Sequence, residues 1–181
     1  MSDLRLSRRY ARALFSLGRE DGSFDQYGKE LGEFTDFYRE NRDFEQVITN
    51  PVFAVEDRKR ILKVVLDKSG FSSLVKNFLN LLLDKNRIGA IEAITEHYQS
   101  LTDEASNIAH AEIVTARPLK EETLDNVVKS LAGLTSKDIK PDVKEDPDII
   151  GGVIVKIGDL VLDGSIKAQL EGLKESFRRG E

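Results

Sequence analysis

The chain contains no cysteine and only two histidines in 181 residues. The absence of cysteine excludes disulfide bonds and thiolate metal sites, and it fits a reducing compartment. Neither His97 nor His110 has an acidic residue or a second histidine at a convincing metal-ligand spacing. Hydrogen-bonded or solvated imidazoles are therefore favoured over metal ligands at both positions, and we expect no metal site.

Long apolar runs are also missing. The longest uninterrupted ones span a handful of residues, such as residues 81–83, whereas a membrane-spanning helix needs about 20. We therefore expect no direct membrane insertion and no secretory signal, which would need a long apolar core. Asp3, Glu20 and Asp21 argue against a transit peptide, although the N-terminal region is rich in arginine: Arg5, Arg8, Arg9 and Arg12.

Positive charge is not in excess in either half of the chain. The formal net charge is −5, with 16 basic and 18 acidic residues through Ala105 and 11 basic and 14 acidic residues after it. A protein that binds a phosphate backbone concentrates lysine and arginine on one surface or in one domain. The composition therefore predicts that nucleic acid is not a partner.

Sequence motifs for catalysis or cofactor binding are absent as well. No serine lies in a nucleophile-elbow context. Gly151 and Gly152 do not form a phosphate loop, because no Gly-Lys-Ser/Thr follows and the pair precedes an apolar run typical of a strand. Their expected role is a bulge or a close approach of two backbone segments. We expect no catalytic residue and no cofactor, and hence a non-catalytic protein.

In the first hundred residues, apolar side chains recur at helical spacing in six consecutive segments with short connections. This pattern predicts a compact six-helix bundle, residues 1–105, whose neighbouring helices run roughly antiparallel. The first and fifth segments carry the stripes that matter below. The first contains Leu6, Tyr10, Ala13, Leu14 and Leu17, and the fifth contains Phe71, Leu74, Val75, Phe78, Leu79 and Leu82.

The first and fifth segments also carry more apolar side chains than one stripe needs. Ala11 and Phe15 widen the first stripe, and Leu81 and Leu83 widen the fifth. Small and aromatic side chains together permit a groove that accepts another helix. A bundle that simply buries wide stripes explains the same residues, and taken alone they favour this second explanation.

The pattern changes after Ala105. Residues 108–116 alternate between apolar and polar side chains, which predicts a strand with one wet face. A helix follows Pro118. Residues 139–144 form a weaker strand that contains Pro141 and is followed by Pro147, which favours an edge strand or an irregular segment. Residues 106–181 therefore form a small α+β domain, and the fold as a whole is mostly α.

Two short apolar runs near the C-terminus predict a hairpin. Gly158 and Asp159 separate them, and glycine at the first central position suits a type II′ turn. Asp163 and Gly164 end the second strand, and Ser165 supplies an N-cap for a closing amphipathic helix. The strands are too apolar to face water on both sides, so we expect one face to pack under this closing helix.

These segments resemble the delta subunit family of F-type ATP synthases, which includes the oligomycin-sensitivity-conferring protein. The resemblance covers nearly the whole chain in the expected order. It rests on Ser7 to Phe15 in the opening helix, on Asn50-Pro51 with Arg58, Lys59, Ile61 and Leu62, and on Asn77-Phe78-Leu79 through Leu82 to Asn86-Arg87. It also rests on the C-terminal Gly151-Gly152, Ile157-Gly158-Asp159 and Leu162-Asp163-Gly164-Ser165.

The resemblance implies a stator component rather than an enzyme. One copy ties the catalytic head to the peripheral stalk, so that proton-driven rotation is coupled to ATP synthesis. It further implies a groove between the first and fifth helices that receives the N-terminal helix of an alpha subunit. The residues expected to flank this groove, some of which must instead face the core, are Tyr10, Ala11, Leu14, Phe15, Phe78, Leu79 and Leu82.

The C-terminal domain is implied to hold the b subunits of the stalk. The hairpin and stalk-side segment is marked by Gly151, Gly152, Gly158, Asp159, Asp163 and Gly164. The resemblance also implies a peripheral position on the cytoplasmic side of a bacterial inner membrane. The alternative from another class is a helical adaptor of an unrelated multi-subunit complex.

Overall fold

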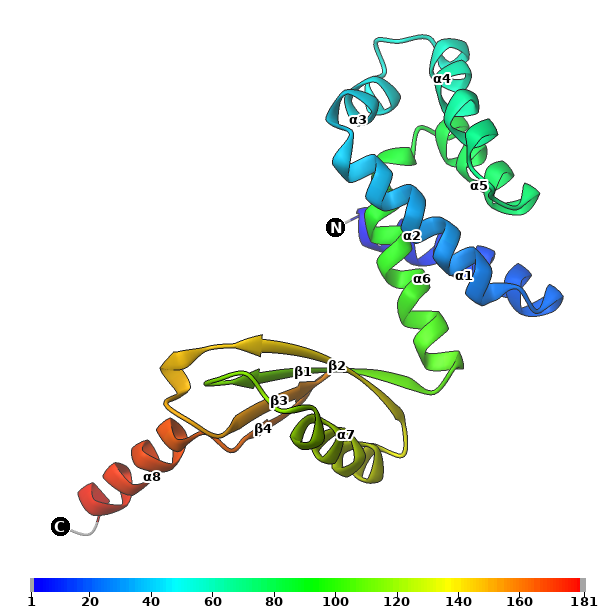
Figure 1. The fold of residues 1–181 in the computed structure, drawn as a ribbon. Helices are drawn as coiled ribbons and strands as arrows, with labels where there is room; N and C mark the ends of the chain where they lie inside the picture. Colours follow the sequence, from blue (N-terminus) through cyan, green and yellow to red (C-terminus); the bar gives the residue numbers. More distant parts are fainter. Residues whose placement is uncertain (1, 180–181) are drawn as a thin grey trace. The chain divides into compact units, whose positions relative to one another are not determined.

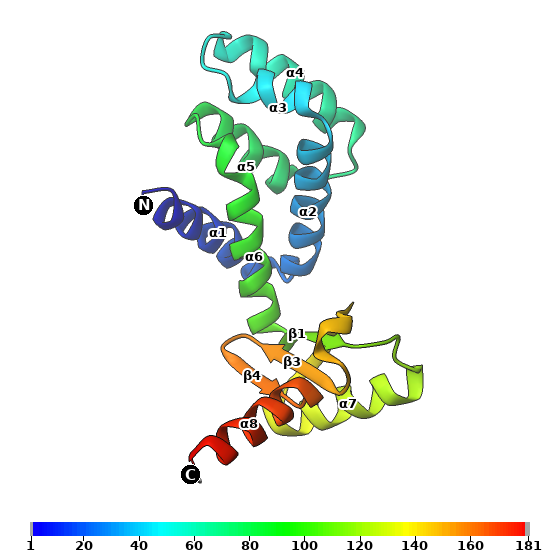
Figure 2. The ribbon, with the colours of Figure 1, turned by 90° about the vertical axis from the view of Figure 1, so that its left-hand side faces the viewer.

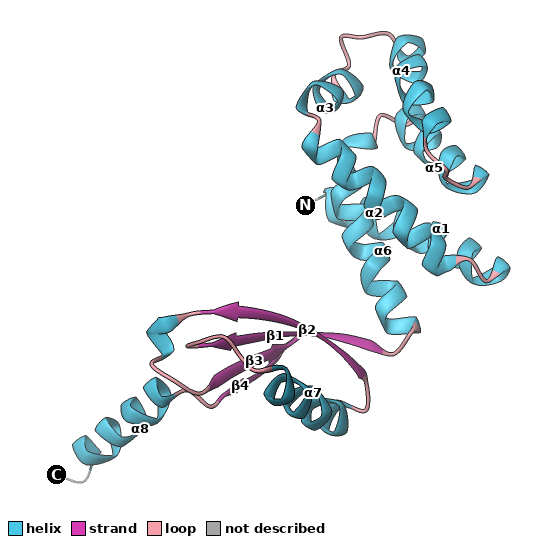
Figure 3. Ribbon diagram, in the orientation of Figure 1, coloured by secondary structure: helices cyan, strands magenta, loops and turns pink. Residues whose placement is uncertain are grey.

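The structure is a computed structural model that describes residues 2–179, and the backbone alone for residues 2, 3, 175, 176, 178 and 179. The chain divides into two compact units, residues 1–102 and 103–181. The first unit is helical and the second combines helices with a small sheet (Figures 1 and 3). The predicted fold class, a helical bundle followed by a small α+β domain, is confirmed.

Six α-helices build the N-terminal unit within the described residues. Their connections are short, and a single-turn 3-10 helix precedes the last of them (Figure 2). The helices are α1 (Ser2–Asp21), α2 (Phe24–Glu40), α3 (Arg42–Thr49), α4 (Val55–Lys68), α5 (Ser73–Asp84) and α6 (Ile91–Ala105), and the 3-10 helix is η1 (Ile88–Ala90).

The bundle core draws large side chains from every helix. Leu31 and Phe34 of α2, Leu79 of α5 and Tyr98 of α6 are at most 1% exposed. Tyr98 is also hydrogen-bonded, because its hydroxyl donates to the Phe24 carbonyl at 2.9 Å. Burial of the ring raises the pKa of the Tyr98 phenol far above its ordinary value. The phenol is therefore a permanent neutral donor in the core.

A polar clasp fixes the start of α5 against α2. The buried Glu30 carboxylate accepts hydrogen bonds from the Ser72 backbone N–H at 2.9 Å and from the Ser72 hydroxyl at 2.7 Å. Gln26 donates to the other Glu30 oxygen at 2.8 Å. Ser72 is also the N-cap of α5, so one carboxylate locks the first turn of α5 in place.

The C-terminal unit contains a four-stranded sheet in the order β2-β1-β3-β4. The strands are β1 (Ile108–Thr115), β2 (Asp138–Glu145), β3 (Val153–Ile157) and β4 (Leu160–Asp163). β2 is parallel to β1, whereas β3 is antiparallel to both β1 and β4. β2 lies at one edge, where Pro141 is tolerated because an edge strand has a free side. The predicted edge strand is thus confirmed.

One helix, α7 (Glu121–Thr135), covers the apolar face of this sheet. The small core contains Ala111 and Ile113 of β1, Leu131 of α7 and Val155 of β3. On the opposite face, Lys144 donates to Glu112 at 3.1 Å. This hydrogen bond raises the pKa of the Lys144 ammonium. The predicted strand with one wet face is confirmed.

The closing helix α8 (Ile166–Arg179) corrects one expectation. It does not cover the hairpin, since α7 packs on the sheet and α8 extends away from it, touching the 3-10 helix η2 (Pro147–Ile149) (Figure 1). The apolar face of the sheet accommodates one helix, and α7 follows β1 directly in the chain. Therefore α8 leaves its own apolar stripe uncovered by the described part of this unit.

The two predicted glycines lie where α8 leaves the sheet. Gly152 has φ +82°, and a Cβ there would lie 2.3 Å from the Gly164 carbonyl oxygen. A Cβ on Gly151 would lie 2.7 Å from the Ile166 side chain. The expected close approach of two backbone segments is confirmed. Only glycine fits at residue 152, for both conformation and space.

The hairpin and the helix start also follow the sequence pattern. Ile157 pairs with Leu160 across the two-residue turn of Gly158 and Asp159, and Gly158 has the positive φ that the prediction required, +55°. The Ser165 hydroxyl accepts from the Ala168 N–H at 3.1 Å, as an N-cap does. Asp163 accepts from the Ser165 N–H at 2.9 Å, which lowers the pKa of its carboxyl.

Candidate partner-binding surfaces

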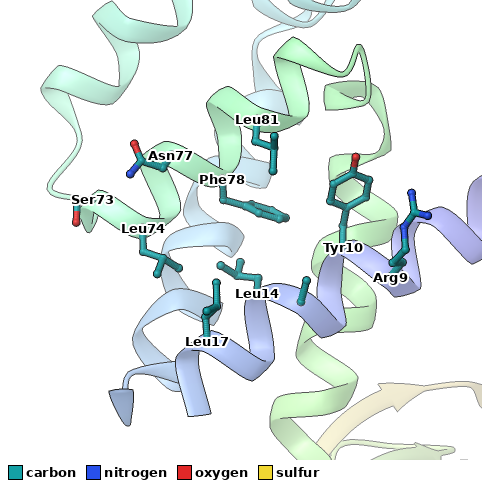
Figure 4. Close-up of a pocket in the computed structure, with 10 residues that line it drawn as sticks. Arg9, Tyr10, Leu14, Leu17, Ser73, Leu74, Asn77, Phe78 and Leu81 are labelled. Carbon is teal, nitrogen blue, oxygen red and sulfur yellow. The ribbon is translucent and has the colours of Figure 1, made fainter. Parts of the chain in front are cut away.

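An elongated hollow of about 640 Å³ lies between α1 and α5. We call it the α1/α5 groove. Most of the side chains that line it are apolar, and the polar ones lie at its edges (Figure 4). The lining residues are Arg9, Tyr10, Ala13, Leu14 and Leu17 of α1, and Ser73, Leu74, Asn77, Phe78 and Leu81 of α5.

Helical spacing explains why these residues share one hollow. In α1, Tyr10, Leu14 and Leu17 lie four and three residues apart, so they share one face of the helix. In α5, Leu74, Phe78 and Leu81 repeat the same spacing. Leu74 lies near Leu17 in Figure 4, and Leu81 lies towards Tyr10, so the two walls of the groove run in opposite directions.

The groove has a closed floor and an apolar rim. Leu14 and Phe78 form the floor and are 1% and 8% exposed, whereas Leu17 and Leu81 on the rim are 46% and 44% exposed. The Tyr10 and Phe78 rings meet edge to face, with centroids 6.2 Å apart. A rigid floor with exposed leucines above it is the form of a helix-in-groove binding site.

The structure separates the predicted groove residues into two sets. Tyr10, Leu14 and Phe78 line the groove. The other four side chains lie in the bundle core and cannot contact a partner in this fold: Ala11, Phe15, Leu79 and Leu82. Each core position is offset from the groove positions by one residue, and one residue rotates a side chain by about 100° around the helix axis.

Several groove residues lie outside the set predicted to flank it. The sequence pattern places Ala13, Leu17 and Leu74 in the stripes that face the core, and it marks Leu81 only as surplus apolar surface, yet all four line the groove. Leu83, the other surplus residue, is fully buried. The width of the two stripes signals the groove, but it does not mark the boundary between the core-facing and the groove-facing side.

A second hollow, of about 560 Å³, lies between α2 and α4. Phe34, Phe37 and Val65 contribute to it, but its lining also includes the opposite charges of Glu33 and Lys68. Among the described side chains, no carboxylate lines the α1/α5 groove. It is therefore the better candidate for an apolar helix face.

The C-terminal unit offers a different surface, the α8 stripe. This stripe consists of Ile166, Leu170, Leu173 and Phe177, which are 43%, 53%, 53% and 75% exposed. Their spacing of four, three and four residues places them on one side of the helix, as the sequence predicted. Leu160 and Leu162 of the edge strand β4 are also exposed. Apolar surface of this extent on one unit marks an interaction site.

The predicted stalk-side residues shape this surface rather than form its apolar part. Gly158 and Asp159 form the turn that ends β3, and Gly151, Gly152 and Gly164 let α8 leave the sheet at close range. Asp163 braces the first turn of α8 through the Ser165 N–H. The segment thus sets the direction of α8, while the exposed apolar area lies in the α8 stripe.

No helix within the described residues is long and apolar enough to cross a membrane. The two histidines lie in different units, His97 in α6 and His110 in β1. His110 is exposed and contacts the Asp103 carboxylate at 3.1 Å. Its geometry is that of a hydrogen-bonded surface imidazole, as the sequence favoured.

Comparison with known proteins gives a consistent picture. Residues 6–177 match the family model described as the ATP synthase delta (OSCP) subunit. The ATP synthase subunit delta of Desulforapulum autotrophicum is 46% identical over 181 residues, which cover all of this chain and 99% of the relative. That of Desulfatibacillum aliphaticivorans is 42% identical over the same length, again with 99% of the relative covered.

A solved structure supports the fold. A chain in the cryo-EM structure of the Toxoplasma gondii mitochondrial ATP synthase hexamer aligns with a TM-score of 0.69. The alignment covers 95% of this chain and 97% of that chain at 16% sequence identity. Two helical walls around a groove, a small sheet with a projecting helix, and full-length sequence matches all agree. The chain belongs to the ATP synthase delta (OSCP) subunit family.

Proposed function

We propose that the α1/α5 groove binds the N-terminal helix of an alpha subunit and that the α8 stripe binds the b subunits of the peripheral stalk. As a family member, the chain has the role of a delta subunit in an F-type ATP synthase, linking the catalytic head to the peripheral stalk. The observation that carries the proposal is the presence of two separate apolar surfaces, one on each unit.

The groove suits a helix because of its shape and lining. Its two walls extend over about two helical turns each, and leucines stand on both rims above an aromatic floor. An amphipathic helix that lays its apolar face into such a groove buries residues at intervals of three and four. A long-lived attachment is needed here, because the head must not turn with the rotor.

The α8 stripe suits a helical partner of another kind. A projecting helix with one apolar side completes its packing when another helix lies along it. The stalk is therefore proposed to contact α8, while Leu160 and Leu162 of β4 add exposed apolar surface on the same unit. One copy per complex is proposed, because a single off-axis stalk requires a single attachment.

The chain is further proposed to have no catalytic step and to lie peripherally on the cytoplasmic side of a bacterial inner membrane. The apolar lining of the groove supports the first point, since Arg9 is the one charged side chain among the described lining residues. The bacterial relatives support the second. ATP hydrolysis by the soluble catalytic head should therefore persist without this subunit, while coupling to proton flow should need it.

The groove is tested with an acidic substitution on its rim. Ala13→Asp places a charge among the lining residues, whereas Ser16→Asp places the same charge on an exposed part of α1 outside the groove. Ala13→Asp should weaken binding of a synthetic alpha-subunit N-terminal peptide about 30-fold or more, because a carboxylate in the groove loses its water when the groove is covered, which costs roughly 2 kcal/mol or more even beside Arg9. Fluorescence anisotropy with the full-length protein measures this.

Ser16→Asp should leave the affinity within about twofold, the effect of a solvated surface charge. Ala11→Asp is unsuitable for this purpose, because Ala11 is fully buried and its replacement by a charge should unfold the bundle. If Ala13→Asp keeps its helical circular dichroism and binds the peptide as tightly as the parent protein, the groove is not the docking site.

The α8 stripe is tested in the same way on the assembled enzyme. Leu170→Asp with Phe177→Asp should release the stalk and abolish proton-driven ATP synthesis in membrane vesicles, while hydrolysis by the head continues. Gly172→Asp is the control, because residue 172 faces open space on another side of α8. Intact coupling in the double variant would reject the stalk assignment.

A further inference from the structure

The first helix is rich in positive charge, although the chain as a whole is negatively charged. The protein carries a net charge of −5, yet α1 begins with a cluster of positive side chains. Asp3 is the one acidic residue among the first 19, which include Arg5, Arg8, Arg9, Arg12 and Arg19. The ion pairs between described side chains involve none of these arginines. This positive charge is therefore open to a partner.

Among these arginines, Arg9 alone lines the α1/α5 groove. Its guanidinium carbon lies 5.8 Å from the centroid of the Tyr10 ring, and the Tyr10 ring in turn meets Phe78 on the floor. Figure 4 shows Arg9 beside Tyr10 at one end of the groove. The aromatic contact restrains the guanidinium, so its donors need little further ordering to bind a carboxylate.

Within the described residues, the α5 side of the groove provides no free carboxylate that could pair with Arg9. The polar lining residues of α5 are the neutral Ser73 and Asn77. The nearest acidic residue in that helix, Asp84, is paired with Lys59 at 2.5 Å. The groove is therefore asymmetric, with a cation on the α1 side and neutral polar groups on the α5 side.

We infer that the helix that binds in the groove carries an acidic side chain beside its apolar stripe, and that this carboxylate pairs with Arg9. The inference rests on the proposed function, because it concerns the occupant of the same groove. Leucine contacts fix how deeply a helix lies but tolerate sliding and rotation, whereas a single ion pair at one end fixes its position. A lysine at the same place is repelled, which selects among amphipathic helices.

The test is a double-mutant cycle with the full-length protein and a synthetic peptide of the alpha subunit's N-terminal helix. Each acidic residue of the peptide is changed in turn to its amide, Glu→Gln or Asp→Asn. The protein variants are Arg9→Gln and, as the matched control, Arg8→Gln, an exposed neighbour outside the groove lining. Both variants lower the net charge of the protein equally.

Arg9→Gln should weaken binding of the parent peptide about three- to fivefold at low salt, the range of an exposed ion pair. One amidated peptide should show the same loss, and combining it with Arg9→Gln should cause no further loss. Raising the salt concentration should remove the difference in affinity between the parent protein and the Arg9→Gln variant. Arg8→Gln should change the affinity by less than about twofold.

Three results would overturn the inference. They are unchanged binding by Arg9→Gln, an equal loss in Arg9→Gln and Arg8→Gln with every peptide, and an alpha peptide that binds tightly although it has no acidic residue. Failure of the proposed function looks different. In that case the peptide does not bind the parent protein, or the Ala13→Asp variant binds it normally. The groove proposal and the ion-pair inference are then rejected together.

Discussion

The two units differ in how completely their apolar side chains are packed within the unit. The N-terminal unit draws its core from all six helices, and the floor of its α1/α5 groove, Leu14 and Phe78, is already closed. Among the described residues, the core cluster of the C-terminal unit has four buried members, Ala111, Ile113, Leu131 and Val155, and α8 remains outside it. The first unit carries a preformed apolar groove, and the second carries a helix whose apolar side is exposed.

This difference matters for binding energetics. A groove built by packed helices binds without reordering, so most of the contact energy appears as affinity. A projecting amphipathic helix loses motion when it is covered, but it can meet a partner helix along its whole length. A linker between two large bodies gains from both, because each attachment can form and be lost independently of the other.

The largest expected effect comes from separating the units. A fragment of residues 1–105 should keep its helical circular dichroism and unfold in one cooperative thermal transition, because its core is complete. A fragment of residues 106–181 should unfold at a clearly lower temperature, since a unit of this size with so small a core is marginal. Calorimetry of both fragments measures the difference. Equal transition temperatures would contradict the contrast drawn between the cores.

A smaller effect is expected from one methyl group in the C-terminal unit. Gly152→Ala should destabilise this unit by about 3 kcal/mol or more, because the residue has φ +82° and its Cβ would lie 2.3 Å from the Gly164 oxygen. Urea unfolding followed by sheet and helix signals measures this, and the N-terminal unit should be unaffected.

Gly172→Ala provides the control for that experiment. Residue 172 lies in α8, and a Cβ at this position would have no atom within 4 Å of it, so alanine should stabilise the helix by about 0.5–1 kcal/mol. If Gly152→Ala is as stable as the parent protein, the close approach at the junction does not exist in solution.

The smallest expected effect concerns pH. The Asp163 carboxylate accepts from the Ser165 N–H, and this lowers the pKa of its carboxyl below the ordinary value of 3.8. Its stabilising contribution is therefore fully present above the pKa of the unfolded chain and is lost as the pH falls through the folded pKa. Asp163→Asn should flatten the stability of the C-terminal unit between about pH 5 and 3. An unchanged slope in the variant would show that Asp163 does not contribute.

Much of the fold follows directly from the sequence. The six helical stripes, the alternating β1, the edge position of β2 and the Gly158 turn are all local patterns whose physical causes act within a few residues. The close approach at Gly152 was predictable for the same reason, because two glycines in an apolar strand have few other uses. The Ser165 N-cap likewise needs only its own sequence context.

What the sequence could not resolve depends on contacts between distant segments. Ala11 and Ala13 are both small and apolar and lie on nearly opposite sides of one helix, but nothing in their local sequence shows that Ala11 is in the core and that Ala13 lines the groove. The way α5 packs across α1 determines which side of α1 faces the core, and this packing cannot be read from a local sequence pattern. The same holds for α8, whose stripe is evident but whose expected place on the sheet is taken by α7.

The junction at which α8 leaves the sheet has a mechanical consequence. Gly164 donates to the Val153 carbonyl at 2.9 Å, and Ile166 donates to the Gly151 carbonyl at 3.0 Å. A pull along α8 is thus carried into β3 by main-chain hydrogen bonds, which do not depend on the identity of neighbouring side chains. The side chains of the α8 stripe can therefore be changed without removing these two hydrogen bonds. The apolar surface of α8 is formed by side chains, whereas its attachment to the sheet is formed by main-chain atoms.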